Sequence, residues 1–153
     1  MTKAIKIYET GGPEVLKYED VEVGDPGEGE IRIRQTASGL NFIDCYQRSG
    51  LYPMDLPCVL GSEAAGVVEA VGPGVDMAIG QRVAYAGARG SYAEERLIPA
   101  GAVVPVPEEY VMAILLPLYV QSKLNSSSSG PVTVTASSKL MVMVTPSAAM
   151  VAD

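Results

Sequence analysis

Histidine is absent from the 153 residues, and this absence limits the chemistry of the chain more than any other compositional feature. Without imidazole, Ser-His-Asp and Cys-His catalysis are excluded, and so is a side chain that titrates near neutral pH. The usual metal ligand is also missing, which leaves two thiols and the carboxylates to bind a metal. Any chemistry therefore depends on a bound cofactor or on Tyr, Asp, Glu, Lys and Ser side chains.

Cysteine is scarce as well, with Cys45 and Cys58 as the two examples. They could form one disulfide, but their pattern is unlike the framework of a small secreted domain. No neighbouring residue suggests a lowered thiol pKa, so we expect both thiols to be inert. The first residues lack the apolar segment of a signal peptide, and no stretch approaches the roughly 20 apolar residues that span a bilayer. We therefore expect a cytoplasmic protein without a membrane segment.

Basic residues are outnumbered, since 11 Lys and Arg face 18 Asp and Glu, and the formal charge is −7. Nucleic acids and anionic membrane surfaces select clustered Lys and Arg. The composition therefore predicts neither as a partner, and the acidity is typical of a protein kept soluble by its charge. With 48% hydrophobic residues, the chain can still bury a sizeable core.

Helix-favouring runs are few, whereas glycine (16) and proline (11) are plentiful. Short extended segments separated by turns are predicted at residues 3–8, 15–18, 30–34, 64–72, 80–86, 90–98 and 103–107. Residues 30–34 alternate strictly, as a half-buried strand does. This series predicts a mainly β fold, a barrel or a sandwich.

Three of these segments, and also residues 37–48, carry more detailed expectations. Residues 64–72 form an unbroken run of small apolar residues, whose glycines would permit a close approach of backbones. We expect residues 90–98 to pair with residues 80–86 across a glycine-rich turn. Residues 37–48 suit a short helix or an irregular loop that ends at Ser49-Gly50.

The composition changes near Glu109, after which charge almost vanishes. We therefore divide the chain into a domain of residues 1–109 and an atypical tail of residues 110–153. The tail has an apolar segment at 111–120, a serine-rich linker at 126–130, and two strands at 132–135 and 140–144 that could form a hairpin packing on the barrel.

Five short motifs follow one another along the first domain: Gly11–Leu16, Asn41–Asp44, Arg48–Pro53, Leu60–Gly66 and Gly80–Val83. In this order and spacing, they resemble the quinone oxidoreductases of the medium-chain dehydrogenase/reductase superfamily. One such fragment would be a weak signal, whereas five in register are a strong one. The resemblance implies a mainly β, GroES-like, partly open barrel with short helices.

The resemblance also implies that no catalytic zinc is bound. Zinc alcohol dehydrogenases of the same superfamily place a metal-binding cysteine where this chain has Asn41. They place a histidine where it has Ser62. Glu63 and Cys45 alone fall short of a tetrahedral zinc site.

In quinone oxidoreductases, the stretch that matches Asn41–Tyr46 faces the nicotinamide end of NADPH. The resemblance therefore implies that the cofactor is NADPH and that it is bound by Asn41, Phe42, Ile43, Asp44 and Tyr46. It implies catalytic roles for Tyr46, Tyr52 and Asn41, the two tyrosines lining the substrate cleft. The cofactor supplies the hydride, so the protein need only orient the rings and donate hydrogen bonds to a developing oxyanion, as Asn41 or Tyr52 can.

Each of these side chains also has a purely structural interpretation. Tyr46 and Tyr52 could be packed aromatics with satisfied hydroxyls. Asp44 could cap a helix or a turn. Glu63 could be a buried, paired carboxylate.

Members of the family continue into a Rossmann domain, whose fingerprint does not occur in these 153 residues. Residues 27–29 and 72–74 are too short of glycine to qualify. The tail could end an engineered domain-deletion scaffold, or a truncated or frameshifted gene. Two functions stay open.

The first function is the catalytic-domain portion of an NADPH-dependent oxidoreductase acting on a quinone or enone. For the isolated chain we then expect weak NADPH binding and no activity. The second is a non-enzymatic GroES-like barrel module or scaffold. Whether the chain forms a homo-oligomer is left open.

Overall fold

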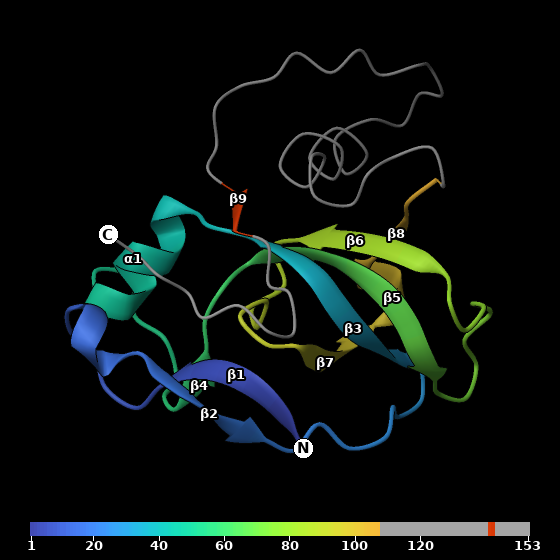
Figure 1. Cartoon of the computed structure of the whole chain (residues 1–153), viewed down its shortest axis with the longest axis horizontal. Helices are drawn as coiled ribbons and strands as arrows, with labels where there is room; N and C mark the ends of the chain where they lie inside the picture. Colours follow the sequence, from blue (N-terminus) through green and yellow to red (C-terminus); the bar gives the residue numbers. More distant parts are fainter. Residues whose placement is uncertain (108–140, 143–153) are drawn as a thin grey trace, which may run out of the picture.

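The computed structural model describes residues 1–107 and 141–142, and strands dominate them (Figure 1). Within these residues, the one α-helix is α1 (Phe42–Ser49), and short 3-10 helices span Pro13–Val15 and Ala100–Ala102. The strands are β1 (Thr2–Ile7), β2 (Lys17–Val21), β3 (Glu30–Gly39), β4 (Cys58–Val59), β5 (Glu63–Val71), β6 (Arg82–Ala86), β7 (Glu95–Pro99), β8 (Val104–Pro105) and β9 (Met141–Val142). The predicted mainly β fold with short helices is confirmed.

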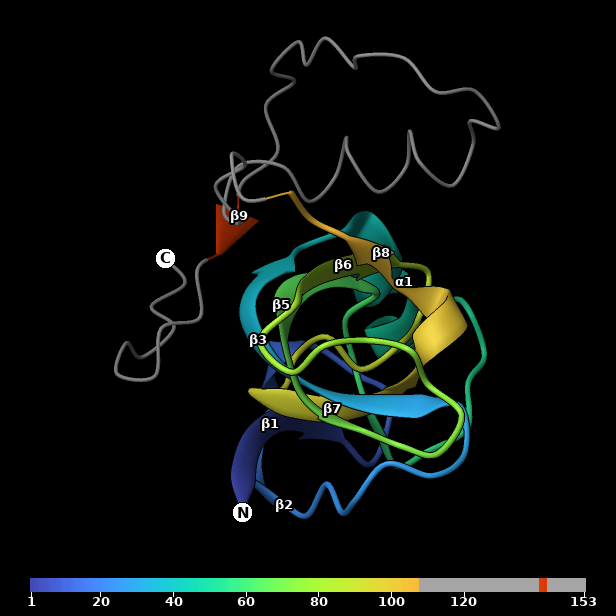
Figure 2. The same ribbon diagram turned by 90° about the vertical axis from the view of Figure 1, so that its right-hand side faces the viewer.

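In the part of the chain that the structure describes, the strands form two open sheets rather than a closed barrel. The smaller sheet has the order β2-β1-β4, and the larger has the order β7-β3-β5-β6-β8, with β9 also paired to β3. Figure 2 shows β1 and β2 below the larger sheet. No helix among the described residues is long and apolar enough to cross a membrane.

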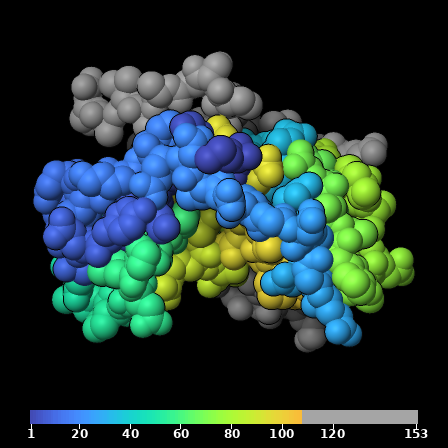
Figure 3. All heavy atoms as spheres, turned by 90° about the horizontal axis from the view of Figure 1, so that it is seen from below, coloured from blue at the N-terminus to red at the C-terminus, as the bar shows by residue number. Residues whose placement is uncertain are grey.

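Strand β1 joins the two sheets through the segment that precedes β7. The Ile5 N–H donates to the carbonyl of Tyr92 over 2.7 Å, and the Glu94 N–H donates to the carbonyl of Lys3 over 2.8 Å. Further along the same edge, β1 pairs with β4, where Ile7 lies opposite Cys58, while β2 pairs with the other edge of β1. Figure 3 shows this face, where the N-terminal strands in blue lie beside the green segment leading to β4.

The main core is built mainly from residues of the larger sheet. The predicted alternation in β3 is confirmed, since Ile31 and Ile33 are fully buried. They pack with Ala64, Val68, Val83, Tyr85, Ile98 and Val103. A separate cluster of Ile7, Val15 and Leu60 lies beneath the smaller sheet.

The glycines of the 64–72 segment permit the close backbone approach that their sequence predicted. A β-carbon on Gly66 would lie only 2.9 Å from the carbonyl carbon of Arg34 on β3. A β-carbon on Gly72 would lie 2.8 Å from the carbonyl carbon of Gly27. Only hydrogen is small enough at these two positions.

The expected pairing of residues 80–86 with residues 90–98 is wrong. Strand β6 pairs with β5 and β8, whereas β7 pairs with β3 at the opposite edge of the sheet. The glycine-rich connection does not turn back as a hairpin because its N–H groups bind the chain around Gly61. Those of Gly87, Gly90 and Tyr92 donate to the carbonyls of Ser62, Gly61 and Leu60.

Two further expectations concern where the helix near residues 37–50 begins and ends. Residues 37–39 continue β3, so the helix is shorter than the segment from which it was predicted. Its end at Ser49 is as expected. Gly50 follows with a φ of 82°, the left-handed conformation that glycine adopts readily at a helix C-terminus.

Most of the predicted tail lies outside the described residues: the apolar segment, the serine-rich linker and the strand at 132–135. Within the predicted strand at 140–144, Met141 and Val142 form β9. They pair with Gly39 and Ser38, at the end of β3 that leads to α1.

Candidate functional site

The six predicted site residues lie on α1 or beside it, where the chain leaves β3. Asn41 is the N-cap of α1, and the carboxylate Oδ2 of Asp44 accepts a hydrogen bond from the Asn41 backbone N–H over 2.9 Å. The Asp44 N–H donates in turn to the Asn41 carbonyl over 3.0 Å. The two residues form a capping box, which fixes the direction in which the helix starts. The interpretation of Asp44 as a cap is therefore confirmed.

Asp44 is buried, with 5% of its surface exposed. The hydroxyl of Tyr92, in the loop before β7, donates to the same Oδ2 over 2.8 Å. The other oxygen, Oδ1, is buried without a hydrogen-bond partner. Burial, followed by the nearby charges of Asp44 and Glu63, raises the pKa of Tyr92, which stays protonated as a donor.

Gly61 leaves the space that the ring of Tyr92 occupies. Its φ of +85° suits glycine, and a β-carbon there would lie 2.5 Å from Cδ1 of Tyr92 and would also collide with the Ser91 hydroxyl. Gly61, the first glycine of the Leu60–Gly66 motif, thus lets the 90–92 loop pack against residues 60–62. Sequence reasoning missed Tyr92, because one aromatic residue in a glycine-rich loop has no periodic or motif signal.

Glu63 is a buried carboxylate with 7% exposure, as one interpretation of the sequence expected. Its side chain covers Gly39, where a β-carbon would lie 2.6 Å from the Glu63 Cδ. Its Oε1 is buried and has no hydrogen-bond partner, so the pairing that we expected is not found for this atom. Two buried carboxylate oxygens without donors therefore lie near the junction of β3 and α1.

The outer face of α1 is apolar and open to solvent. Phe42 is 82% exposed, Tyr46 is 39% exposed and Asp44 is the one buried residue of the helix. A helix that packs on a globular core normally buries its apolar face and exposes its charges. Figure 1 shows α1 at the outer end of β3, beside the sheets rather than between them.

Tyr52 extends this face from the loop after the helix. Its ring packs edge to face against that of Tyr46, with centroids 5.5 Å apart, and its N–H donates to the Tyr46 carbonyl over 3.1 Å. Tyr52 is 50% exposed. The two tyrosines contact each other, and yet both keep much of their surface open to a ligand.

The C-terminal end of α1 is tied to another of the sequence motifs. The Arg48 guanidinium donates to the carbonyl of Gly11 over 2.9 Å, and the Gly11 N–H donates to the carbonyl of Arg48 over 2.9 Å. Both ends of the helix are therefore held by polar contacts.

A buried polar network supports the loop that carries Tyr92. The Gln35 side-chain amide donates to the carbonyl of Ala93 over 2.6 Å and accepts from the Tyr85 hydroxyl over 2.6 Å. The Ser38 hydroxyl donates to that of Ser91 over 2.8 Å. Burial raises the pKa of Tyr85. These bonds join β3 and β6 to the residues on either side of Tyr92.

In the part of the chain that the structure describes, no group of three His, Cys, Asp or Glu residues could hold a metal ion. Both cysteines are free thiols. Burial raises the pKa of Cys58, whose sulfur lies 3.5 Å from that of Met54. A raised pKa disfavours the reactive thiolate, which agrees with the inert Cys58 thiol that we expected.

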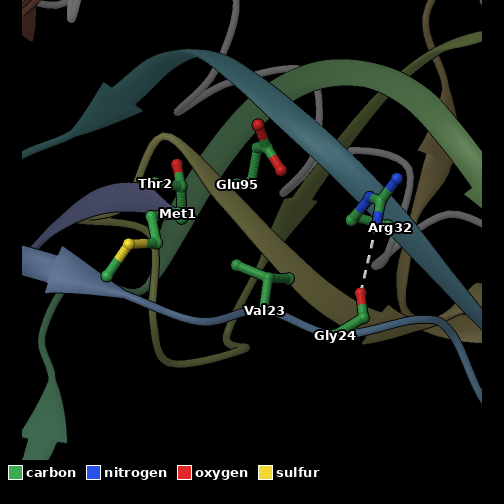
Figure 4. A pocket seen from close by; sticks show the side chains of 6 residues that line it. All are labelled: Met1, Thr2, Val23, Gly24, Arg32 and Glu95. Atoms are coloured by element: carbon green, nitrogen blue, oxygen red, sulfur yellow. Dashed lines mark hydrogen bonds between the residues drawn. The ribbon is translucent and has the colours of Figure 1, made fainter.

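A small polar hollow of about 130 Å³ lies elsewhere, lined by Met1, Thr2, Val23, Gly24, Arg32 and Glu95 (Figure 4). The Arg32 guanidinium donates across it to the carbonyl of Gly24 over 3.1 Å. None of the predicted site residues lines this hollow.

Residues 27–108 match the family of alcohol dehydrogenase GroES-like domains, and the chain belongs to this family. The quinone oxidoreductase of Pseudomonas aeruginosa is 48% identical over 123 residues, which are 76% of this chain and 38% of that protein. The 2-haloacrylate reductase of a Burkholderia species is 45% identical over 71% of this chain and 34% of its own length. The resemblance to quinone oxidoreductases is confirmed.

The solved structures agree with this placement. The quinone oxidoreductase of Escherichia coli in complex with NADPH superposes with a TM-score of 0.70 at 43% identity, covering 72% of this chain and 35% of that one. The chain thus spans little more than a third of the length of these relatives.

Proposed function

We propose that this domain forms the nicotinamide side and the substrate wall of an NADPH-dependent reductase of quinones or enones. The observation that carries the proposal is the pattern of burial on helix α1. The helix buries a carboxylate and exposes aromatic rings, the reverse of an ordinary amphipathic helix. An exposed apolar face adds no buried surface to the core, and it suits a flat, partly apolar ligand. Relatives named as quinone oxidoreductases, one of them solved with NADPH, support the same assignment.

The residues present suit the nicotinamide end of the cofactor. Phe42 and Ile43 offer an exposed apolar surface to a flat ring. Asp44 is buried beneath this surface, where its carboxylate accepts from the Asn41 N–H and fixes the start of the helix that carries these residues. We assign the binding of this end to Asn41, Phe42, Ile43, Asp44 and Tyr46. The bound cofactor supplies a hydride, and the residues of this chain hold and orient the reacting groups.

The substrate side is assigned to Tyr46, Tyr52 and Asn41. Quinones and 2-haloacrylate share a carbon–carbon double bond conjugated with a carbonyl group. Reduction of such a bond places negative charge on the carbonyl oxygen. A phenol or an amide can donate a hydrogen bond to that oxygen without any strong acid in the site.

We further propose that the chemistry needs no zinc. Asn41 and Ser62 occupy the positions of two ligands in the zinc enzymes of the superfamily, and neither side chain is a good zinc ligand. Elemental analysis of the protein, purified without added metal, should give far less than one zinc per chain. One zinc per chain would contradict this.

The central test follows backbone amide signals by NMR while NADPH is added to the 153-residue chain. We expect the shifts to concentrate at residues 41–46 and to weaken in Phe42→Ala. The control Tyr18→Ala removes another exposed ring, from β2, and should leave the shifts unchanged. Shifts spread elsewhere, or none at all, would favour a non-enzymatic module instead.

A matched kinetic test measures NADPH consumption with a simple quinone. The 153-residue chain should give a rate near background. The same residues joined to a nucleotide-binding domain should give a clear rate. Equal background rates in both would contradict the proposed activity.

A further inference from the structure

We propose that Tyr92 is a positioning residue of the site: its hydroxyl holds Asp44, which in turn holds the backbone N–H of Asn41 at the start of α1. The ligand named in the test rests on the proposed function. The chain of contacts stands on geometry alone, as both bonds meet at Oδ2 of Asp44, over 2.8 Å from Tyr92 and 2.9 Å from Asn41.

Helix α1 depends on such contacts because it has little apolar packing. Its only buried residue is Asp44, while Phe42 and Tyr46 face solvent. A helix is usually fixed by burying its apolar stripe, and most of its stability comes from that packing. Here the N-terminal end is fixed by Asp44 and the C-terminal end by the reciprocal bonds of Arg48 and Gly11.

Tyr92 is itself held by backbone hydrogen bonds to β1 and to the segment between β4 and β5. Its N–H donates to the carbonyl of Leu60 over 3.0 Å, and its carbonyl accepts from the Ile5 N–H over 2.7 Å. Its ring packs where Gly61 leaves room. A donor fixed in this way fixes the position of Asp44 in turn, because the Asp44 carboxylate accepts its hydrogen bond.

The consequence for the proposed site follows from its size. About one and a half turns of backbone contain Asn41, Asp44 and Tyr46. A displacement of Asp44 therefore also moves Asn41 and Tyr46. Errors of about 1 Å in the placement of reacting groups can cost about 100-fold in rate. The phenol of Tyr92 need not touch a ligand to matter.

The test compares Tyr92→Phe with Tyr85→Phe in the full 153-residue chain. Each variant keeps the ring and removes the phenol oxygen. Tyr92→Phe loses the hydrogen bond to Asp44, whereas Tyr85→Phe loses the bond to Gln35 and the bond that Arg96 donates. We expect Tyr92→Phe to speed hydrogen exchange of the Asn41 amide by about tenfold, as loss of one charge-assisted bond would. It should also raise several-fold the NADPH concentration that shifts the α1 signals.

Tyr85→Phe should lower the melting temperature but leave both quantities at their wild-type values, because the Gln35 amide still donates to the carbonyl of Ala93 and the Tyr92 hydroxyl still donates to Asp44. The proposal is overturned if Asn41 exchanges at the wild-type rate in Tyr92→Phe, or if Tyr85→Phe speeds it equally. If Tyr92→Phe does not fold, Asp44→Asn takes its place, since it keeps the shape and removes the charge. Wild-type exchange of Asn41 in Asp44→Asn would likewise overturn the proposal.

The two proposals can fail separately. If NADPH shifts no signal at α1 in the wild-type chain, the proposed function fails. The exchange rates of Asn41 in the two tyrosine variants still decide whether Tyr92 positions the helix.

Discussion

The ring of Tyr52 stands edge-on to the ring of Tyr46, at an interplanar angle of 73°. Pairs of this kind contribute about 0.5–1.5 kcal/mol beyond the area that they bury. Each ring therefore orients the other, although neither is enclosed by the core. The pair presents two phenols at a fixed spacing on the outer face of the domain, as the proposed substrate wall would require.

Removal of the Tyr52 hydroxyl should weaken quinone binding without weakening the fold. Tyr52→Phe keeps the edge-to-face contact and removes one donor, worth about 1 kcal/mol, or roughly a fivefold loss of affinity. Binding is measured by NMR titration with a simple quinone, and stability by thermal unfolding. Tyr18→Phe on β2 is the control and should change neither. An unchanged quinone affinity in Tyr52→Phe would remove this residue from the proposed site.

Gly66→Ala should destabilise the domain by roughly 1–3 kcal/mol, because the added methyl group meets the backbone of β3 rather than a movable side chain. The matched control is Gly101→Ala. Nothing lies within 4 Å of its new β-carbon, so its stability should stay within about 0.5 kcal/mol of wild type. Urea unfolding of both variants measures the difference. Equal stabilities would show that β3 and β5 can separate at little cost.

Stability should fall as the pH rises above the ordinary tyrosine pKa of 10.0, because burial raises the pKa of Tyr85 and Tyr92 in the folded chain. Above that pH the unfolded chain loses these protons while the folded chain keeps them. The folded state then binds more protons, and the free energy of unfolding decreases by up to about 1.4 kcal/mol per pH unit for each tyrosine. Cys58, raised from 9.0, adds to the decrease from a lower pH.

Urea unfolding at several alkaline pH values tests this dependence. Tyr92→Phe should make the decline shallower, because one of the groups that lose a proton only on unfolding is removed. A free energy of unfolding that stays constant across this range would contradict the assigned burial of the two phenols.

Local sequence patterns predicted most of the strands, while the connections between them depended on distant contacts. Alternation found β3, and small apolar residues with glycine found β5, since both patterns reflect burial within a single strand. The route from β6 to β7 was mispredicted because it is set by hydrogen bonds from Gly87 and Gly90 to residues some 25 positions earlier in the chain. No local pattern records such bonds.

The candidate site shows the same division. The motif containing Asn41 and Asp44 located the helix start, and the cap that sequence propensity suggested for Asp44 is present. Tyr92 escaped notice, since its role exists only once the loop before β7 packs beside Gly61. The exposure of Phe42 was equally hidden, because an apolar residue in a short helix normally predicts burial.

The affinity of the 153-residue chain for NADPH should be no tighter than roughly millimolar, about −4 kcal/mol. These residues contain no Rossmann fingerprint to hold the pyrophosphate on a helix N-terminus, and charge-assisted contacts of that kind are about twice as strong as neutral ones. The proposed site offers mainly neutral groups beside the buried carboxylates of Asp44 and Glu63, in a chain of net charge −7. Calorimetry or fluorescence titration measures the dissociation constant. Since like charges repel, added salt should tighten binding rather than weaken it. A low micromolar constant that weakens with salt would instead require a cationic nucleotide site, formed by residues other than those assigned to the ligand above.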